Sequence, residues 1–414
     1  MEKVVLAYSG GLDTSVAVRW ISDNYSMDVI TLTADLGQAG DMEATKRRAL
    51  AVGAVDARTV DAKQMFVDHF VWPSLQASAK YEDAYYLATA LGRPLISWLL
   101  VDLARETGAK AVAHGSTGKG NDQVRFDVSI NTLEPSLRII APMREWNMNR
   151  DQEIDYAKKH DIAIPITPER PYSTDANLWG RSVEAGVLED AWVEPPEDVY
   201  EWTSNPATAP KDPEYIEVEF EQGIPISIDS QLLDGVPLIQ QLHEAGCRHG
   251  IGRSDHVENR LIGIKSREIY EMPAAEILHT AHYALETITL TREQMRFKKL
   301  VSAEYARMVY DGLWFSGLHR ELAAYLEINQ KNVTGTVRIK LWKGTCTAVG
   351  RKSPESLYQT ELATYGADDT FDHNAALGFI KLHGLSQQTQ ARTQIAAGRE
   401  LPRISRPGKG DSVQ

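Results

Sequence analysis

Cysteine is scarce in this sequence of 414 residues, which contains only Cys247 and Cys346. Because these two residues lie far apart in the chain, the sequence favours neither a disulfide framework nor a zinc site built from cysteine pairs. This usage fits a reducing compartment, so we expect a cytoplasmic protein. We name no metal-binding residue from the sequence.

Long hydrophobic runs and clusters of positive charge are also missing. The longest apolar stretch, residues 94–101, is too short to span a bilayer, and no charged leader precedes the first strand-like segment. The formal net charge is −13 and no group of Lys and Arg stands out, which argues against a nucleic-acid partner, since phosphate backbones are bound by clustered cations. We expect a soluble globular protein with no membrane partner.

Strand-like and helix-like segments alternate in the first part of the chain. Strands are predicted at residues 3–8, 28–34, 58–60, 110–114 and 137–141, and helices at residues 14–24, 42–52, 63–70, 95–106 and 150–160. This βαβα order predicts an α/β fold, a doubly wound parallel sheet with helices on both faces. Ligands of such sheets bind outside the carboxyl ends of the strands.

The second part of the chain has a different pattern. Strands are predicted from residue 215 and at residues 335–342 and 345–351, the last two joined by a Lys343-Gly344 turn, with helices at residues 238–244, 273–287 and 291–310. This pattern predicts a second, α+β domain. Together with proline-rich linkers, it divides the chain into residues 1–166, 167–371 and 372–414.

The last of these three parts is polar. A weakly helical stretch at residues 382–397 precedes a tail rich in Pro and Gly, and neither could form a core alone. We expect this C-terminal helix to serve oligomerisation by packing on another subunit.

One motif follows the first predicted strand directly. It consists of Ala7, Tyr8, Ser9, Gly10, Gly11, Leu12, Asp13, Thr14 and Ser15. The paired glycines allow a tight turn that exposes backbone N–H groups, and the helix that follows places its positive end under the loop, so the motif predicts a phosphate site. The two common glycine-rich phosphate motifs do not fit it. It is similar to the pyrophosphate loop of the N-type ATP pyrophosphatases, which cut ATP between its α and β phosphates.

A second motif follows the predicted strand at residues 110–114. It runs from His114 to Arg125 and combines glycines with a cation, a carboxylate, an amide and hydroxyls. We interpret it as a loop for polar ligands, because a simple surface turn needs fewer functional groups. The loops at residues 9–15, 34–38 and 114–122 each follow a strand, so we expect them to converge on one crevice.

Taken together, the two motifs resemble the argininosuccinate synthetase family. Further family-like segments occur at residues 80–83, 184–186, 257–260, 265–271 and 350–354. The resemblance implies an ATP-dependent ligase that joins citrulline to aspartate through citrullyl-AMP, releasing AMP and pyrophosphate, in arginine biosynthesis. It also implies a homotetramer, with Mg²⁺ carried by ATP.

The resemblance also implies a role for individual residues. The first domain would hold ATP through the residues from Ala7 to Ser15, Ala34 and Gly115. Aspartate would contact Thr117, Asn121 and Asp122. Citrulline would contact Tyr85, Asn121, Arg125, Ser173, Ser182, Glu258 and Tyr270.

The chemistry of these residues fits citrulline, whose ammonium and carboxylate complement Glu258 and Arg125. Asp122 is the candidate for orienting or deprotonating the aspartate ammonium, with a loop-capping turn as the alternative. Many relatives have Ser at the position of Ala90, so a citrulline contact is either absent here or supplied by Thr89.

Two other functions share the first motif. A tRNA-thiolating enzyme would need a basic RNA-binding surface and usually reactive cysteines, which the composition opposes. A non-catalytic ATP-sensing module would leave the motif from His114 to Arg125 without a purpose.

Overall fold

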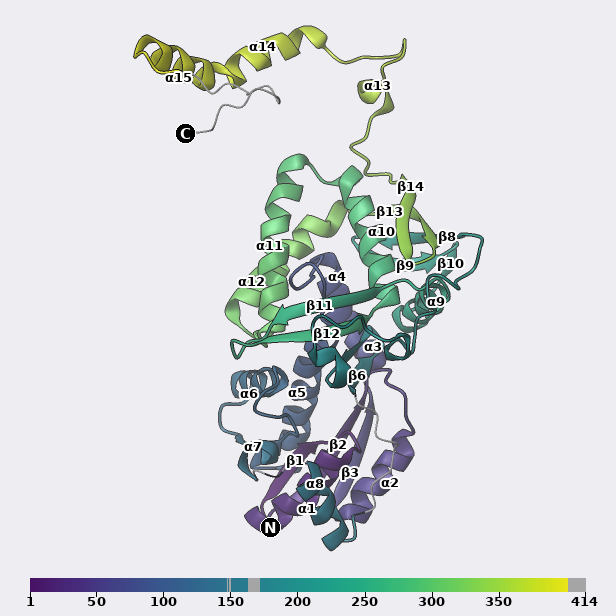
Figure 1. Cartoon of the computed structure of the whole chain (residues 1–414), viewed down its shortest axis with the longest axis vertical. Coiled ribbons are helices and arrows are strands. Elements are labelled where there is room, and N and C mark those ends of the chain that lie inside the picture. The colour runs from purple at the N-terminus through teal and green to yellow at the C-terminus, as the bar shows by residue number, and fades with distance from the viewer. Residues whose placement is uncertain (147, 149, 163–171, 401–414) are drawn as a thin grey trace. The chain divides into compact units, whose positions relative to one another are not determined.

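Five parallel strands form the sheet that begins the structure, in the order β3-β2-β1-β4-β5. Their bounds are β1 (Lys3–Ala7), β2 (Asp28–Asp35), β3 (Asp56–Asp61), β4 (Ala111–Ala113) and β5 (Arg138–Ile140). In this computed structural model, residues 1–146, 148, 150–162 and 172–400 are described. The order confirms the predicted doubly wound sheet, in which the chain runs outward from β1 on both sides. Figure 1 labels three of its strands, β1, β2 and β3.

Helices cover both faces of this sheet. Val4 and Leu6 of β1 point into one core with α1 (Leu12–Tyr25), α2 (Met42–Val52) and α8 (Arg150–Lys159). Val5, on the opposite face, belongs to a second core with α5 (Ala88–Thr107) and α6 (Asp122–Leu133). Shorter helical segments are α3 (Lys63–Phe66), η1 (Val67–Val71), α4 (Trp72–Gln76) and α7 (Pro142–Glu145).

Two helix predictions in this region were wrong. Residues 122–125 are not loop but the first turn of α6, in which the Arg125 amide donates to the Asn121 carbonyl at 3.2 Å. Helix α5 starts at Ala88 rather than at residue 95, because it accommodates Pro94 in its interior instead of beginning after it. Both helix starts lie beside polar residues of the predicted site.

A four-stranded antiparallel sheet follows, in the order β11-β12-β7-β6. Its strands are β6 (Ser173–Asn177), β7 (Gly180–Glu184), β11 (Arg253–Asn259) and β12 (Lys265–Glu271), with η2 (Gly186–Glu189) and η3 (Glu197–Val199) between them in sequence. The sequence patterns missed all four strands. Their residues are largely polar, because one face of this sheet lines a cleft instead of a core, so the apolar alternation of a half-buried strand is absent.

The third sheet confirms the predicted α+β character of the second part. Its order is β10-β9-β8-β13-β14, all antiparallel. Its strands are β8 (Glu214–Glu221), β9 (Ile224–Ile228), β10 (Gln231–Leu232), β13 (Gly335–Trp342) and β14 (Thr345–Lys352). The accompanying helical segments are α9 (Gly235–Arg248), α10 (Pro273–Thr289), α11 (Arg292–Tyr310), α12 (Gly317–Asn329) and η4 (Gln330–Asn332).

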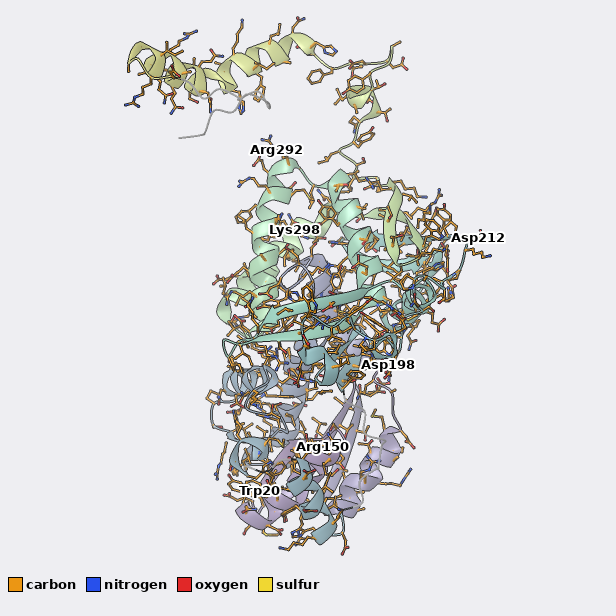
Figure 2. The ribbon with its side chains drawn as sticks, viewed as in Figure 1. Trp20, Arg150, Asp198, Asp212, Arg292 and Lys298 are labelled. Carbon is orange, nitrogen blue, oxygen red and sulfur yellow. The ribbon has the colours of Figure 1, made fainter. Side chains whose placement is uncertain are left out.

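A buried ion pair fastens α11 to α10. Lys298, labelled in Figure 2, is 2% exposed, and its Nζ lies 2.5 Å from Oε1 of Glu286. The same ammonium donates to Ser78 Oγ at 2.7 Å, so the buried charge is paired and also hydrogen-bonded. This pair joins the N-terminal half of α11 to α10, and Tyr310 is the last residue of the same helix.

Residues 358–414 form a compact unit separate from residues 1–357. Its helices are α13 (Thr360–Ala363), α14 (His373–His383) and α15 (Leu385–Ala396), and none of its described residues is buried. Exposed apolar side chains on α14 include Leu377, Phe379 and Ile380. The predicted boundaries at residues 166 and 371 stay predictions, and the first falls outside the described residues. None of the helices in the described ranges has the length and apolar character needed to cross a membrane.

Candidate active site

A cleft of about 1380 Å³ opens at the carboxyl ends of β1, β2 and β4. The loops after these three strands contribute to its wall, together with one face of the β11-β12-β7-β6 sheet. Within the described part of the chain, every predicted site residue lines this cleft except Gly10 and Ser15. The structure therefore gathers residues from position 7 to position 270 around one space.

The first loop is held by contacts among its own hydroxyls. Ser9 Oγ lies 3.0 Å from Thr14 Oγ1, and the Tyr8 hydroxyl lies 2.9 Å from Ser15 Oγ. Gly10 has a φ of +80°, and its carbonyl accepts from Arg48 Nη1 at 2.6 Å. Gly10 and Ser15 thus support the loop from behind the cleft.

Helix α1 begins at this loop, slightly earlier than predicted, with Gly11 as its N-cap. No side chain among the described residues caps this end. The amide groups of the first turn are therefore free to bind an anion, at the positive end of the helix dipole.

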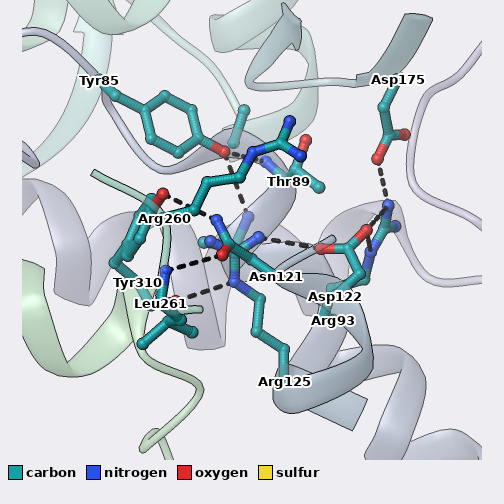
Figure 3. Close-up of polar contacts among 12 residues, drawn as sticks. Tyr85, Thr89, Arg93, Asn121, Asp122, Arg125, Asp175, Arg260, Leu261 and Tyr310 are labelled. Carbon is teal, nitrogen blue, oxygen red and sulfur yellow. Dashed lines mark hydrogen bonds and ion pairs between the residues drawn. The ribbon is translucent and has the colours of Figure 1, made fainter. Parts of the chain in front are cut away.

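The second loop leads into α6, and its Asp122 lies between two arginines (Figure 3). Arg93 donates to Asp122 Oδ2 from Nε at 2.8 Å, and Arg125 donates to Oδ1 from Nη1 at 2.9 Å. Burial alone would raise the pKa of Asp122, but the two guanidinium groups lower it below its usual value. Asp122 is thus a stable carboxylate paired with side chains, and no described backbone amide forms the alternative capping turn with it.

The polar sheet supplies the opposite wall. In its register Tyr270 is aligned with Ser182, and Ser182 with Asp175. Glu258, on the edge strand β11, accepts from the Tyr270 hydroxyl at 2.5 Å and is 3% exposed. Sheet pairing thus brings Ser173, Ser182, Glu258 and Tyr270 together although they are far apart in sequence.

Two family models and several named relatives match this chain. Residues 3–163 match a family model described as the arginosuccinate synthase N-terminal HUP domain, and residues 172–390 match the model of the arginosuccinate synthase C-terminal domain. A protein of Symbiobacterium thermophilum named argininosuccinate synthase is 55% identical over 394 residues, covering 95% of this chain and 98% of that protein. One of Oceanobacillus iheyensis with the same name is 54% identical over 399 residues, 96% of each chain.

The chain belongs to the argininosuccinate synthase family. It is accordingly an AMP-forming ligase of arginine biosynthesis, which confirms the function predicted from the sequence. Neither the tRNA-thiolating nor the ATP-sensing alternative is needed.

In this argininosuccinate synthase, the first turn of α5 contains both Thr89 and Ala90. The Tyr85 hydroxyl accepts from the amides of Thr89 at 2.8 Å and Ala90 at 3.3 Å, and its ring stacks on Tyr270 with centroids 4.3 Å apart. Thr89 lines the cleft, whereas Ala90 is fully buried. Of the two, only Thr89 can present a hydroxyl to the cleft.

Carboxylates gather at the sheet side of the synthase cleft. Arg260 pairs with both Glu184 and Glu268, the latter at 2.7 Å. Burial, together with the charges of Glu184 and Glu258, raises the pKa of Glu268 to about 9. Arg93 and Arg125 lie on the other side of the cleft, at α5 and α6, with Asp122 between them, so both sides of the cleft present paired charges to a substrate.

Sequence reasoning missed three residues of this synthase site. Arg93 and Arg260 line the cleft, and Tyr310 contacts several of its wall residues from behind. Arg93 carries a usable signal, because it is a lone charge in the apolar stretch Leu91-Gly92-Arg93-Pro94-Leu95. Tyr310 carries no such signal in the sequence, since it is the last residue of an ordinary amphipathic helix.

Proposed function

We propose that this cleft binds ATP, citrulline and aspartate together and joins the amino acids in two steps. The ureido oxygen of citrulline attacks the α phosphorus of ATP, forming citrullyl-AMP and releasing pyrophosphate. The amine of aspartate then attacks the ureido carbon, a proton leaves the nitrogen, and AMP departs to give argininosuccinate. Both nucleophiles belong to substrates, so the protein acts by positioning and by electrostatic stabilisation.

The first loop is proposed to hold the phosphates of ATP. Its support is the uncapped start of α1 after Gly10 and Gly11, which offers backbone donors and the helix dipole to the leaving pyrophosphate. Ala34 and Gly115 line the cleft beside it and are proposed to contact the nucleotide.

Mg²⁺ is proposed to arrive with ATP. Such an ion keeps several waters and takes one or two protein carboxylates beside the phosphates. The described residues include no group of three or more His, Cys, Asp or Glu that could form a complete metal site, but Asp13 lines the cleft in the first turn of α1 and fits the single-carboxylate requirement. Bound there, the ion would neutralise part of the phosphate charge.

One observation carries the assignment of the amino-acid sites. The Nη2 group of Arg125 is buried and has no hydrogen-bond partner among the described residues. A buried, unpaired guanidinium donor is unfavourable unless a ligand engages it, and a carboxylate is its best partner. The citrulline carboxylate therefore fits Arg125, and the citrulline ammonium fits Glu258, whose oxygens retain acceptor capacity beyond the two phenol hydrogen bonds.

Asp122 is proposed to orient the aspartate ammonium rather than to deprotonate it. Its pKa is lowered by Arg93 and Arg125, and a carboxylate of low pKa is a weak base near neutral pH. Thr117 and Asn121 line the same part of the cleft and would complete the aspartate site.

An isotope experiment tests the chemistry directly. Citrulline labelled with ¹⁸O in its ureido group should give AMP that contains the label, because the C–O bond breaks in the second step while the P–O bond stays. Pyrophosphate should remain unlabelled. As the control, unlabelled citrulline in ¹⁸O water should give unlabelled AMP.

Other outcomes of this experiment would overturn the proposal. AMP labelled from water would indicate simple hydrolysis of ATP, and unlabelled AMP in the first reaction would indicate that citrulline is not the group that is activated. Formation of ADP and phosphate would show that the wrong bond of ATP is cut.

We further propose a cytoplasmic homotetramer. The support for oligomerisation is the exposed apolar side chains of α14, which find no burial in their own unit of the chain. Cys247 and Cys346 are free thiols, as a reducing compartment allows.

A further inference from the structure

Tyr310 is the last residue of α11 and contacts three of the predicted substrate residues at once. Its hydroxyl lies 2.5 Å from Oε1 of Glu258 and 2.7 Å from Nδ2 of Asn121, and its carbonyl accepts from Arg125 Nε at 2.9 Å. Figure 3 shows Tyr310 together with Asn121 and Arg125. The Tyr310 side chain is 1% exposed.

The direction of each hydrogen bond follows from the donors available. A carboxylate only accepts, so the single hydroxyl proton of Tyr310 points to Glu258. The amide nitrogen of Asn121 only donates, so it gives a proton to the Tyr310 oxygen. Asn121 Oδ1 is then left to accept from the Leu261 amide at 3.0 Å, which fixes the orientation of the side-chain amide.

The ring of Tyr310 is held as firmly as its hydroxyl. Tyr81 stacks on it with centroids 3.6 Å apart and planes at 3°, and the guanidinium carbon of Arg125 lies 4.8 Å from the ring centroid. Burial, and then the charge of Glu258, raise the pKa of Tyr310 far above its usual value, so the hydroxyl keeps its proton. The orientation of this hydroxyl therefore does not change with pH near neutrality.

We propose that Tyr310 is a positioning residue for both the citrulline site and the aspartate site. Its single hydroxyl holds Glu258 and Asn121 in place at the same time, because it is hydrogen-bonded to both. This inference rests on the proposed function, since it takes Glu258 as a citrulline contact and Asn121 as a contact of both amino acids. Tyr310 touches neither substrate, because it lies behind the residues that line the cleft.

The test is Tyr310→Phe, which keeps the ring, its stacking and the backbone carbonyl but removes the hydroxyl. Loss of a hydrogen bond to a charged group should raise the KM for citrulline by roughly 10- to 100-fold, and loss of the acceptor for Asn121 should raise the KM for aspartate as well. The KM for ATP should stay near its wild-type value.

The chain offers a matched control on the same helix. Tyr305 is fully buried, and its hydroxyl has no hydrogen-bond partner among the described residues. Tyr305→Phe should therefore leave all three KM values unchanged. Tyr270→Phe gives a second comparison, because Tyr270 donates to Glu258 and, among the described residues, forms no hydrogen bond with Asn121. It should therefore raise the KM for citrulline alone.

Each result decides a separate question. If the wild-type protein forms no AMP when citrulline and aspartate are supplied, the proposed function fails. If it does, and Tyr310→Phe behaves as Tyr305→Phe or raises the KM for ATP as much as those for the amino acids, only this inference fails.

A second variant keeps the test decisive if Tyr310→Phe does not fold. Replacing Tyr310 with 3-fluorotyrosine retains the hydroxyl and the ring but makes the oxygen a poorer acceptor for the Asn121 amide. The KM for aspartate should rise while the KM for ATP does not. An unchanged KM for aspartate would overturn the inference.

Discussion

Arg125 gives the sharpest prediction about substrate binding. Two of its donor groups are committed within the protein, Nε to the Tyr310 carbonyl and Nη1 to Asp122, each at 2.9 Å. Its Nη2 is buried and has no hydrogen-bond partner among the described residues. The group left for a substrate carboxylate is therefore a charged donor shielded from water.

From this geometry we expect Arg125→Ala to remove one charge-assisted hydrogen bond to citrulline. Such a bond contributes about 1.5–3 kcal/mol, so the affinity for citrulline should fall by roughly 10- to 150-fold. Asp122 keeps both contacts with Arg93, at 2.8 and 2.7 Å, so the affinity for aspartate should change much less. ATP binding should be nearly unaffected.

Calorimetric titration of each substrate and the KM values from AMP formation check this expectation. Arg105→Ala is the control, because Arg105 lies on α5 with its side chain 54% exposed and pairs with Glu134 at 3.0 Å. An exposed pair contributes at most about 1 kcal/mol to stability, so this variant should bind all three substrates normally. Equal losses for ATP and citrulline in Arg125→Ala, or a loss confined to aspartate, would refute the assignment.

Two further predictions concern pH and assembly. Burial and the Asp13 carboxylate raise the pKa of Glu153 from 4.5 to about 8, so its contribution to stability is complete below about pH 4.5 and is lost as the pH rises through 8. Between pH 5 and pH 9, the melting temperature of Glu153→Gln should therefore fall less than that of the wild type. If the melting temperatures of the two proteins fall in parallel with pH, the raised pKa of Glu153 is contradicted. Truncation before Asp372 should reduce the mass measured by light scattering, because it removes the apolar side chains of α14; an unchanged mass would exclude a role of this segment in assembly.

The sequence alone determined those elements of this protein that depend on interactions between residues close together in the chain. The run of Val4, Val5 and Leu6 into Gly10 and Gly11 specifies a buried strand, a tight turn and a helix start without any distant partner. The Lys343-Gly344 turn is equally local, with both residues at positive φ between β13 and β14. The parallel sheet could be predicted because alternating strands and helices allow few other arrangements.

Only the tertiary structure decided what the site residues do. Ser182, Glu258 and Tyr270 meet because β7, β11 and β12 pair in one register, and these strands have no local signature, since their cleft face is polar. The low pKa of Asp122 depends on Arg93, which lies one helix earlier in the chain. The role of Tyr310 depends on partners 52 and 189 residues away. Pair contacts of this kind are set by packing across the whole chain, and no local pattern of residues encodes them.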